Sequence, residues 1–450
     1  MPTAPSAVDQ GFLRRVTIAT AFGEGLDGYD LGEISVVLAL LIAPELHMSP
    51  IWTGLIGSSS LLGIFLGGPI FGWFTDRFGR RRLFTADLVV FIVASLLQFL
   101  VQSDWQLFVV RIVLGLAIGA ECSVGAPILS EFVPRSRRGN RLATLEVCWY
   151  LGYLASVVAA YALILIPGIG WRLVLASSAV PALVTLLLRM GMPESPRWLM
   201  SQGREPEARA IIDRYLGGEA SFQGEDYAGE LQETQANFVR LFSRQYLSRT
   251  LFLCIFWSCL VAPYFAIFTF ANEVLKDMRL SNPVAGQIAI NGVAAVGCIT
   301  GMLVVERIGR RTLLIGTFWI SAIALAVTIW SGLPGWGTVL AFMVFSFFNA
   351  SAAVLCAIYP NELFPTELRG SGAGIGSAAS RVGAAVGTFL LPVGLSTIGI
   401  GPSMAIGAAI LVLGAVVSHL WAPETTGQTL TVASGVRRAG PGTMTVPVGR

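Results

Sequence analysis

The sequence predicts an all-α membrane protein in which twelve transmembrane helices form two pseudo-symmetric halves of six. Three observations support this fold class. The composition is 54% hydrophobic and 13% charged, with a mean hydropathy of +0.70, whereas about a quarter of the residues in a soluble domain are charged. Twelve apolar runs reach the roughly 20 residues that a membrane span needs. Finally, three short motifs recur in the second half of the chain at nearly one offset.

Polar connections separate the twelve expected spans. The spans lie near 16–42, 53–73, 83–102, 106–130, 143–166, 172–191, 250–271, 284–304, 313–331, 337–359, 371–396 and 402–421. The long polar segment 192–248 has apolar residues at helical spacing in Arg204–Tyr215 and Leu231–Phe242, which predicts short amphipathic helices. The expected units are an N-terminal tail (1–15), two six-helix halves (16–191 and 249–422), the linker between them (192–248) and a C-terminal tail (423–450), disordered from about 430.

The arginines indicate the orientation in the membrane. They gather in alternate short connections and in the linker, while the opposite connections hold few basic residues. Because Lys and Arg in short loops stay on the cytoplasmic side, both termini are expected to be cytoplasmic, in a bacterial inner membrane. The net charge is only +3 and the basic residues lie in loops, which argues against a nucleic-acid partner.

Three motif pairs indicate an internal duplication. Asp76-Arg77-Phe-Gly79-Arg80-Arg81 recurs as Glu306-Arg307-Ile-Gly309-Arg310-Arg311, 230 residues later (306 minus 76). The run from Glu131 to Arg138 recurs from Glu362 to Arg369 at an offset of 231, and Pro193-Glu-Ser recurs as Pro423-Glu-Thr at 230. A duplication of this kind is typical of transporters built from two parallel six-helix repeats.

The repeated motifs predict a charged gate at the cytoplasmic ends of the helices. We expect Asp76 to accept bonds from backbone N–H groups at a nearby helix start. We also expect Glu131 to pair with Arg138, and Glu362 with Arg369. Such a network would stabilise the state that is closed toward the cytoplasm. The expected gate residues are Gly72, Asp76, Arg77, Gly79, Arg80, Arg81, Glu131, Arg138, Glu306, Arg307, Arg310, Arg311, Glu362 and Arg369.

The first span carries four acids at every third position, Glu24, Asp27, Asp30 and Glu33. A charged side chain at the bilayer centre costs about 2.5–3.5 kcal/mol on insertion scales, so such residues face the protein interior and have partners. Arg111 in the fourth span is the obvious cation, and glycines four residues apart beside it permit close helix packing. Asp27, Asp30 and Arg111 are the candidate proton-coupling residues; the alternative is a static buried ion pair.

Further polar residues within the spans are candidates for contact with a substrate. Arg381 could receive an anion or instead extend to the cytoplasmic interface, and Glu121 is similarly ambiguous. Ordinary packing and hydrogen bonding between helices is the alternative for the others. The candidates are Glu146, Trp149, Tyr150, Tyr264, Asn272, Asn291, Asn349 and Arg381.

These motifs closely resemble the major facilitator superfamily, and within it the sugar-porter branch. The resemblance covers about 16–430 and is carried by the loop from Gly72 to Arg81, by Gly28-Tyr-Asp-Leu-Gly32, by Pro193-Glu-Ser-Pro-Arg-Trp-Leu199, by Tyr359 to Gly370, and by Pro423-Glu-Thr-Thr-Gly427. It implies the major facilitator fold and alternating access. It also implies that Asp30 and Arg111 match the coupling pair of proton-coupled members.

The sequence departs from sugar porters at the positions that hold a hexose. Glu146 replaces a glutamine, and the seventh span lacks the Gln-Gln…Asn signature. Asp27-Gly-Tyr-Asp30 and Arg381 instead resemble the branch of aromatic-acid/proton symporters. The resemblance therefore implies a proton-coupled symporter for a small polar metabolite, either an organic acid or a sugar-like compound.

Other functions remain open alternatives. They are a uniporter, a proton-coupled efflux antiporter, and a non-transporting receptor on the same fold. An enzyme is not expected, because the two histidines, His47 and His419, lie at opposite ends of the chain and supply neither a metal site nor a triad. No cofactor is expected. The expected partners are the substrate, protons and the lipid bilayer, with the protein as a monomer.

Overall fold

Helices make up all the regular structure in the described part of the chain. The computed structural model describes residues 9–133, 135–216, 238–277, 282–329, 335–364 and 366–426. The first half contains α1 (Gln10–Val37), the π-helical turn η1 (Leu38–Ile42), α2 (Ala43–Glu45), α3 (Pro50–Phe78), α4 (Arg80–Leu97), the 3₁₀ turn η2 (Gln98–Leu100), α5 (Asp104–Phe132), α6 (Arg135–Ile164), α7 (Trp171–Ala176) and α8 (Ala179–Arg189).

The described parts of the connecting segment and of the second half are also helical. Their elements are α9 (Pro196–Ser201), α10 (Glu205–Tyr215), the 3₁₀ turn η3 (Phe238–Phe242), α13 (Leu247–Thr269), α14 (Ala271–Asp277), α15 (Pro283–Ile308), α16 (Arg310–Val327), α17 (Gly335–Leu363), α18 (Thr366–Thr397) and α19 (Ile400–Trp421). The predicted helix over Arg204–Tyr215 matches α10, which buries Ala208 and Ile212. Most of the one predicted over Leu231–Phe242 lies outside the described residues, as does the tail from 427.

Eleven helical segments in the described part of the chain are long and apolar enough to cross a membrane. One of them, Trp171–Arg189, comprises α7 and α8, with a break at Ser177. The twelfth span of the fold is α1, which is more polar than the other eleven because it carries the four acids. The helices also run past the expected ends of the apolar runs; α1, for example, begins at Gln10, where Asp9 accepts bonds from two free backbone N–H groups.

Within each half, glycines bring helix backbones into direct contact. A Cβ at Gly28 of α1 would lie 2.1 Å from the carbonyl oxygen of Trp149 on α6. On α5, a Cβ at Gly115 would lie 2.2 Å from the carbonyl oxygen of Ser60 on α3. In the second half, a Cβ at Gly301 of α15 would lie 2.2 Å from that of Ser351 on α17. These contacts require glycine.

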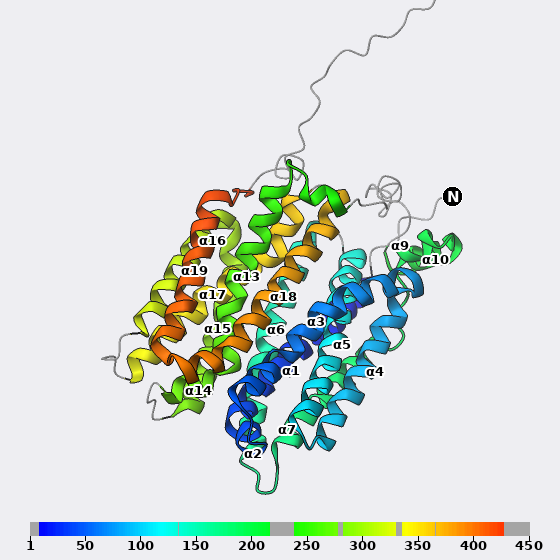
Figure 1. Ribbon diagram of the computed structural model, residues 1–450. Helices are drawn as coiled ribbons and strands as arrows, with labels where there is room; N and C mark the ends of the chain where they lie inside the picture. The colour runs from blue at the N-terminus through cyan, green and yellow to red at the C-terminus, as the bar shows by residue number, and fades with distance from the viewer. Residues whose placement is uncertain are drawn as a thin grey trace, which may run out of the picture.

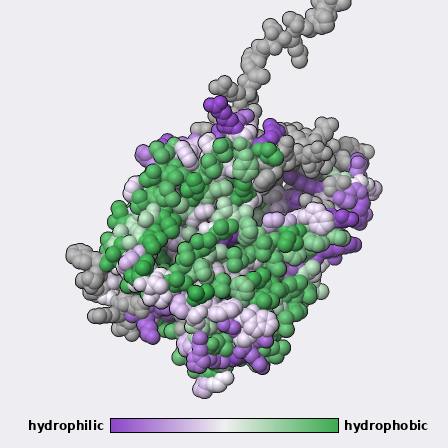
Figure 2. Space-filling view, in the orientation of Figure 1, coloured by the Kyte–Doolittle hydropathy of each residue, from purple (hydrophilic) through white to green (hydrophobic). Residues whose placement is uncertain are grey.

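The two halves lie side by side as two helix bundles (Figure 1). Across the boundary, α3 packs along α18 and α6 along α15. The approach is close at Gly54 of α3, where a Cβ would lie 2.4 Å from the carbonyl oxygen of Phe389 on α18. Figure 2 shows hydrophobic side chains across the middle of the visible face and hydrophilic side chains near its two ends, as expected of a body surrounded by lipid.

We call the two ends of the bundles the motif end and the far end. The motif end carries the turns at Gly79 and Gly309 and the helices α9 and α10. The far end carries α2, α7 and α14 (Figure 1). Helix α1 runs from the motif end to the far end. Of its four acids, Glu24 is therefore nearest the motif end and Glu33 nearest the far end.

Candidate functional site

Asp30 and Arg111 form a buried ion pair in the first half. The Arg111 Nη2 atom lies 3.0 Å from Asp30 Oδ2, and neither residue is exposed. The Ser60 hydroxyl lies 3.3 Å from both Asp30 Oδ2 and the Arg111 carbonyl oxygen, so α3 supports the pair that joins α1 to α5. The glycine contacts of α5 with α3 hold these backbones close enough for this arrangement.

A second acid shares this site. Glu33 lies one helical turn along α1 from Asp30, is fully buried, and is close enough to Asp30 and Arg111 to interact with both charges. Gln98 accepts a long bond of 3.5 Å from Arg111 Nη1 and donates to the Leu175 carbonyl oxygen. The site thus contains one cation and two carboxyl groups.

Asp27 is not part of this pair. It faces a different cluster, formed by Arg189 of α8 with Glu121 of α5 and Asp87 of α4. Arg189 lies 2.5 Å from Glu121 and 3.6 Å from Asp87, and all of these side chains are buried. Of the three candidate proton-coupling residues, Asp30 and Arg111 therefore lie together, and Asp27 lies in a separate cluster.

The sequence prediction missed Arg189 and Asp87 and left Glu121 without a partner. Arg189 lies at the end of the sixth apolar run, four residues before Pro193, where an arginine is easily interpreted as an interfacial anchor. Asp87 was within the third apolar run and could have been identified by the same argument as Asp30, since an acid within a span needs a partner.

Three charged side chains, all half-buried, come together from both halves of the molecule. Glu24 of α1 and Glu146 of α6 belong to the first half, and Arg381 of α18 to the second. Their charges interact with one another, and the buried Nε atom of Arg381 has no hydrogen-bond partner. The structure therefore brings together Glu146 and Arg381, two of the predicted substrate-binding residues.

Aromatic side chains from both halves meet beside these charges. Trp149 and Tyr150 of α6 contact Tyr264 of α13, with ring centroids 6.3 and 5.8 Å apart. Tyr264 also stacks on Phe268 at 4.0 Å, and its buried hydroxyl has no hydrogen-bond partner. The three predicted aromatic residues thus lie at the boundary between the halves.

The predicted asparagines have other positions. Asn272 lies in a polar network near the far end, where the Tyr161 hydroxyl is 2.6 Å from both Asn272 Oδ1 and Gln287 Oε1. Gln287 also donates to the Ser35 hydroxyl, which links α15 to α1 and so joins the two halves. Asn291 donates to a carbonyl of its own helix, and Asn349 to the Leu260 carbonyl oxygen.

At the motif end, the two copies of the repeated motifs adopt matching structures. Gly79 and Gly309 end their helices with φ of +93° and +90°, a conformation that favours glycine. Glu194 then accepts bonds from the backbone N–H groups of Arg80 and Arg81, and Glu424 does the same for Arg310 and Arg311. The carboxylates that cap these helices are therefore those of the Pro-Glu motifs.

The other gate acids pair with the arginine after each of these glycines. Glu131 lies 2.5 Å from Arg80 and bonds the Ser195 hydroxyl, while Glu362 lies 3.2 Å from Arg310 and bonds the Thr425 hydroxyl. The expected partners were Arg138 and Arg369. Their side chains, and that of Asp76, lie outside the described residues. The pairing of Glu131 with Arg138 and of Glu362 with Arg369 stays a prediction, and the described contacts add an arginine of the neighbouring loop to each acid.

The remaining gate residues are more loosely held. Arg77 is exposed and lies over the Trp73 ring at 5.6 Å, and Arg307 is exposed. Arg311 donates to the His419 carbonyl oxygen at 2.7 Å, Glu306 pairs with Arg310 at 2.7 Å, and nothing lies within 4 Å of a Cβ placed at Gly72. The contacts of Glu131 and of Glu362 described above therefore do not connect the first half to the second half.

Partial burial acts to raise the pKa of Glu424, but the hydrogen bonds it receives outweigh this effect. Those bonds come from the Thr426 hydroxyl and from the backbone N–H groups of Thr426, Arg310 and Arg311. The pKa of Glu424 therefore lies below its usual value, and the group is ionised at neutral pH.

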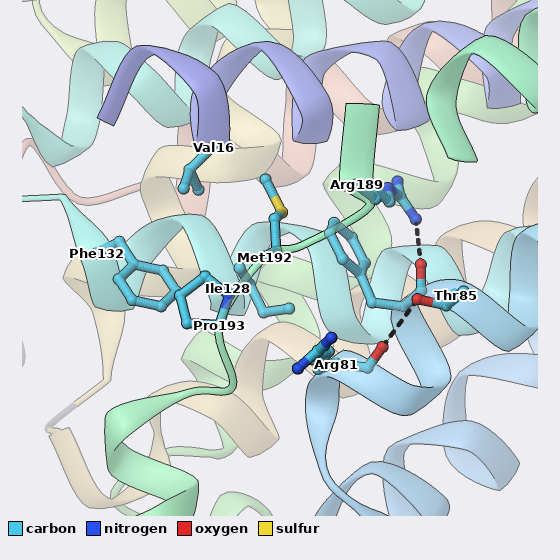
Figure 3. A pocket seen from close by; sticks show the side chains of 9 residues that line it. Val16, Arg81, Thr85, Ile128, Phe132, Arg189, Met192 and Pro193 are labelled. Carbon is cyan, nitrogen blue, oxygen red and sulfur yellow. Dashed lines mark hydrogen bonds between the residues drawn. The ribbon is translucent and has the colours of Figure 1, made fainter. Parts of the chain in front are cut away.

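A small pocket lies beside the Arg189 cluster, toward the motif end (Figure 3). Arg189 reaches from α8 to the Phe84 carbonyl oxygen on α4 at 3.0 Å, and Arg81 forms another part of the lining. The complete lining is Val16, Arg81, Phe84, Thr85, Ile128, Phe132, Arg189, Met192 and Pro193.

Comparison with known proteins places this arrangement in a family. Residues 16–434 match the family described as "Sugar (and other) transporter". The inner membrane metabolite transport protein YgcS of Escherichia coli is 37% identical over 97% of this chain and 98% of its own length. The niacin transporter NiaP of Acinetobacter baylyi is 28% identical over 79% of this chain and 81% of its own.

A solved structure supports the same fold. The inward open conformation of the xylose transporter XylE from E. coli superposes with a TM-score of 0.80 at 22% identity, covering 94% of this chain and 99% of that chain. The twelve-helix, two-half architecture predicted from the sequence is thus confirmed. The chain belongs to the sugar (and other) transporter family of the major facilitator superfamily and is a multi-pass metabolite transporter of the inner membrane.

Proposed function

We propose that the protein is a proton-coupled symporter that imports a small organic acid by alternating access. The observation that carries the coupling is the buried pair of Asp30 and Arg111, with Glu33 in the same site. Arg111 balances one of the two carboxylates. Protonation of Asp30 releases Arg111 from the ion pair and so removes a link between α1 and α5. This favours the conformational change between the two states of alternating access.

The conformation supports an inward-facing assignment. The polar network of Tyr161, Asn272 and Gln287 joins the two halves near the far end, whereas the contacts described at the motif end stay within each half. The arginine-rich turns belong on the cytoplasmic side, so the motif end and both termini are cytoplasmic. A substrate released from this state enters the cytoplasm.

Arg381 supports an anionic substrate. It is a half-buried cation from the second half whose buried Nε lacks a partner, and it faces Glu146 and Glu24 of the first half. A bound carboxylate would satisfy this guanidinium, and the aromatic rings of Trp149 and Tyr264 would pack on a flat ring. The family member NiaP transports niacin, a ring carrying a carboxylate, which fits this chemistry.

The substrate class is tested by thermal shift on the purified protein with nicotinate, benzoate and xylose. We expect the two acids to raise the melting temperature and xylose to have no effect. Loss of a charge-assisted hydrogen bond costs about 1.5–3 kcal/mol, so Arg381→Gln should bind these acids roughly tenfold to a hundredfold more weakly. Arg214→Gln, at an exposed position on α10, is the matched control. A shift with xylose that Arg381→Gln leaves intact would refute an acid substrate.

The coupling is tested in proteoliposomes with an acid found in that screen. Asp30→Asn should abolish accumulation driven by an inward proton gradient while exchange of labelled for unlabelled acid persists, because an amide cannot carry the proton. Glu45→Gln, at an exposed acid at the far end, should behave as wild type. Normal accumulation by Asp30→Asn would show that this pair does not couple transport to protons.

A further inference from the structure

The cluster around Arg189 contains more negative charge than its arginine can balance. Arg189, Glu121, Asp87 and Asp27 are each 5% exposed or less. One guanidinium therefore faces three buried carboxyl groups, contributed by α5, α4 and α1. Ionised carboxylates without a partner are strongly disfavoured in such a place, so the charge count alone calls for bound protons.

Both terminal nitrogens of Arg189 already have partners, while its Nε has none. Its Nη2 contacts Glu121 Oε1 at 2.5 Å and its Nη1 bonds the Phe84 carbonyl oxygen at 3.0 Å, while the guanidinium lies 3.5 Å above the Phe84 ring. Asp87 Oδ2 is left 3.6 Å from Nη1, too far for a hydrogen bond. Arg189 thus bonds Glu121 rather than Asp87. Asp87 Oδ1 accepts the Leu88 N–H at 2.7 Å, so it is Oδ2 that needs another partner.

That partner is Glu121 itself. The Asp87 and Glu121 carboxyl groups lie within hydrogen-bonding reach of each other. Yet Asp87 Oδ2 and Glu121 Oε2 are both buried oxygens without any donor. Two ionised carboxylates repel each other and neither can donate, whereas one proton held between the two groups turns their contact into a hydrogen bond.

The pair lies between a small pocket and the charges at the centre of the molecule. The pocket of Figure 3 is lined by Arg189 and Arg81 and lies toward the motif end. On the other side, Asp27 interacts with Glu121, Asp87 and Glu24, and Glu24 in turn with Glu146 and Arg381. The groups that face the pair are therefore Arg189 (α8), Asp27 and Glu24 (α1), and Cys122 (α5).

We propose that Asp87 and Glu121 hold one proton between them beside Arg189, as a second proton-binding site distinct from Asp30 and Arg111. Asp27 of this cluster lies three positions before Asp30 on α1, so the two sites are about one helical turn apart along that helix. The contacts above are the evidence for this site. Its role in transport, in which a proton would leave the protein from this site toward the motif end, rests on the proposed symport.

The proton is detectable by infrared spectroscopy of the full-length protein in liposomes, without any substrate. At neutral pH we expect Asp87→Asn and Glu121→Gln each to lower the C=O band of protonated carboxyl groups by the area of one group per chain. In each variant the remaining carboxyl group pairs with Arg189 as a carboxylate. The conservative Glu121→Asp should keep the band, and Glu45→Gln is the exposed control. Equal band areas in wild type and both amide variants would refute the shared proton.

Folding gives an independent readout. An amide resembles a protonated carboxyl group, so Asp87→Asn and Glu121→Gln should both fold with the wild-type melting temperature at pH 7. Failure of both variants to fold would show that Arg189 needs two ionised partners and would overturn the proposal. Neither the infrared band nor the melting temperature depends on transport. An Asp30→Asn variant that still couples transport to protons would therefore refute the proposed symport without affecting the test of the shared proton.

Discussion

The helix caps at Glu194 and Glu424 lead to a prediction in which each copy of the motif serves as a control for the other. Each carboxylate accepts backbone N–H groups at the start of a helix, α4 or α16, directly after a glycine of positive φ. The N–H···O distances are 3.0 and 3.1 Å in both copies. Glutamine at either position keeps one acceptor oxygen, removes the charge and turns an N–H₂ group toward N–H donors.

The magnitude follows from these contacts. A hydrogen bond to a charged group contributes about 1.5–3 kcal/mol, and a negative charge in the first turn of a helix about 0.3–1 kcal/mol. Losing one such bond and the charge should therefore weaken the start of each helix by about 2–4 kcal/mol. The two caps lie in different halves, so the double variant should show the sum of the single effects.

Hydrogen–deuterium exchange with mass spectrometry resolves the two sites. Glu194→Gln should speed exchange in the first turn of α4 by at least roughly 30-fold and leave α16 unchanged, and Glu424→Gln should do the reverse. The exposed Glu205→Gln serves as the control. Unchanged protection at both helix starts, or the same change in both helices from one substitution, would refute the capping argument.

Three further predictions concern other parts of the fold. The pKa of Glu424 is lowered in the folded chain, so the ionised carboxylate stabilises the fold fully above the usual pKa of 4.5, and this stabilisation is lost as the pH falls through the lowered pKa. The melting temperature, measured at decreasing pH, should show this loss. In Glu424→Gln this pH-dependent loss should be absent. Gly28→Ala should destabilise the protein by about 1–3 kcal/mol or prevent its folding, because the new Cβ meets Trp149. Gly374→Ala, with open space around it, should melt like wild type. Tyr161→Phe should weaken the link near the far end by about 0.5–1.5 kcal/mol and raise the outward-facing population, measured by distances between spin labels.

The sequence predicted the architecture well because the bilayer imposes it. Span length, loop arginines and the motif offset are all local or periodic features, and they led to twelve helices in two halves. The matched turns at Gly79 and Gly309 show that the repeat extends to backbone geometry. The ion pair of Asp30 and Arg111 was also within reach, since an intramembrane acid needs a cation and few cations were available.

The sequence could not identify the neighbours of some predicted residues, and there is one cause. Asp27 and Asp30 are three residues apart on a helix, so they face similar directions, and which neighbouring helix each one meets depends on tertiary packing. The same holds for Asn272, a polar residue in an apolar run whose partners, Tyr161 and Gln287, come from helices far away in the sequence. Helical periodicity gives a direction and does not identify the neighbour.

The close approach of Gly54 to the Phe389 carbonyl oxygen makes this point of the boundary a fulcrum. Backbones in contact at this point cannot move closer together, so a tilt of the first half about this point would turn α3 as a lever. From Gly54 to Arg77 the helix spans 23 residues, or about 35 Å, and each degree of tilt moves its tip by about 0.6 Å. A larger residue at Gly54 would shift the fulcrum, and with it the ratio between movement at the motif end and movement around the central charges.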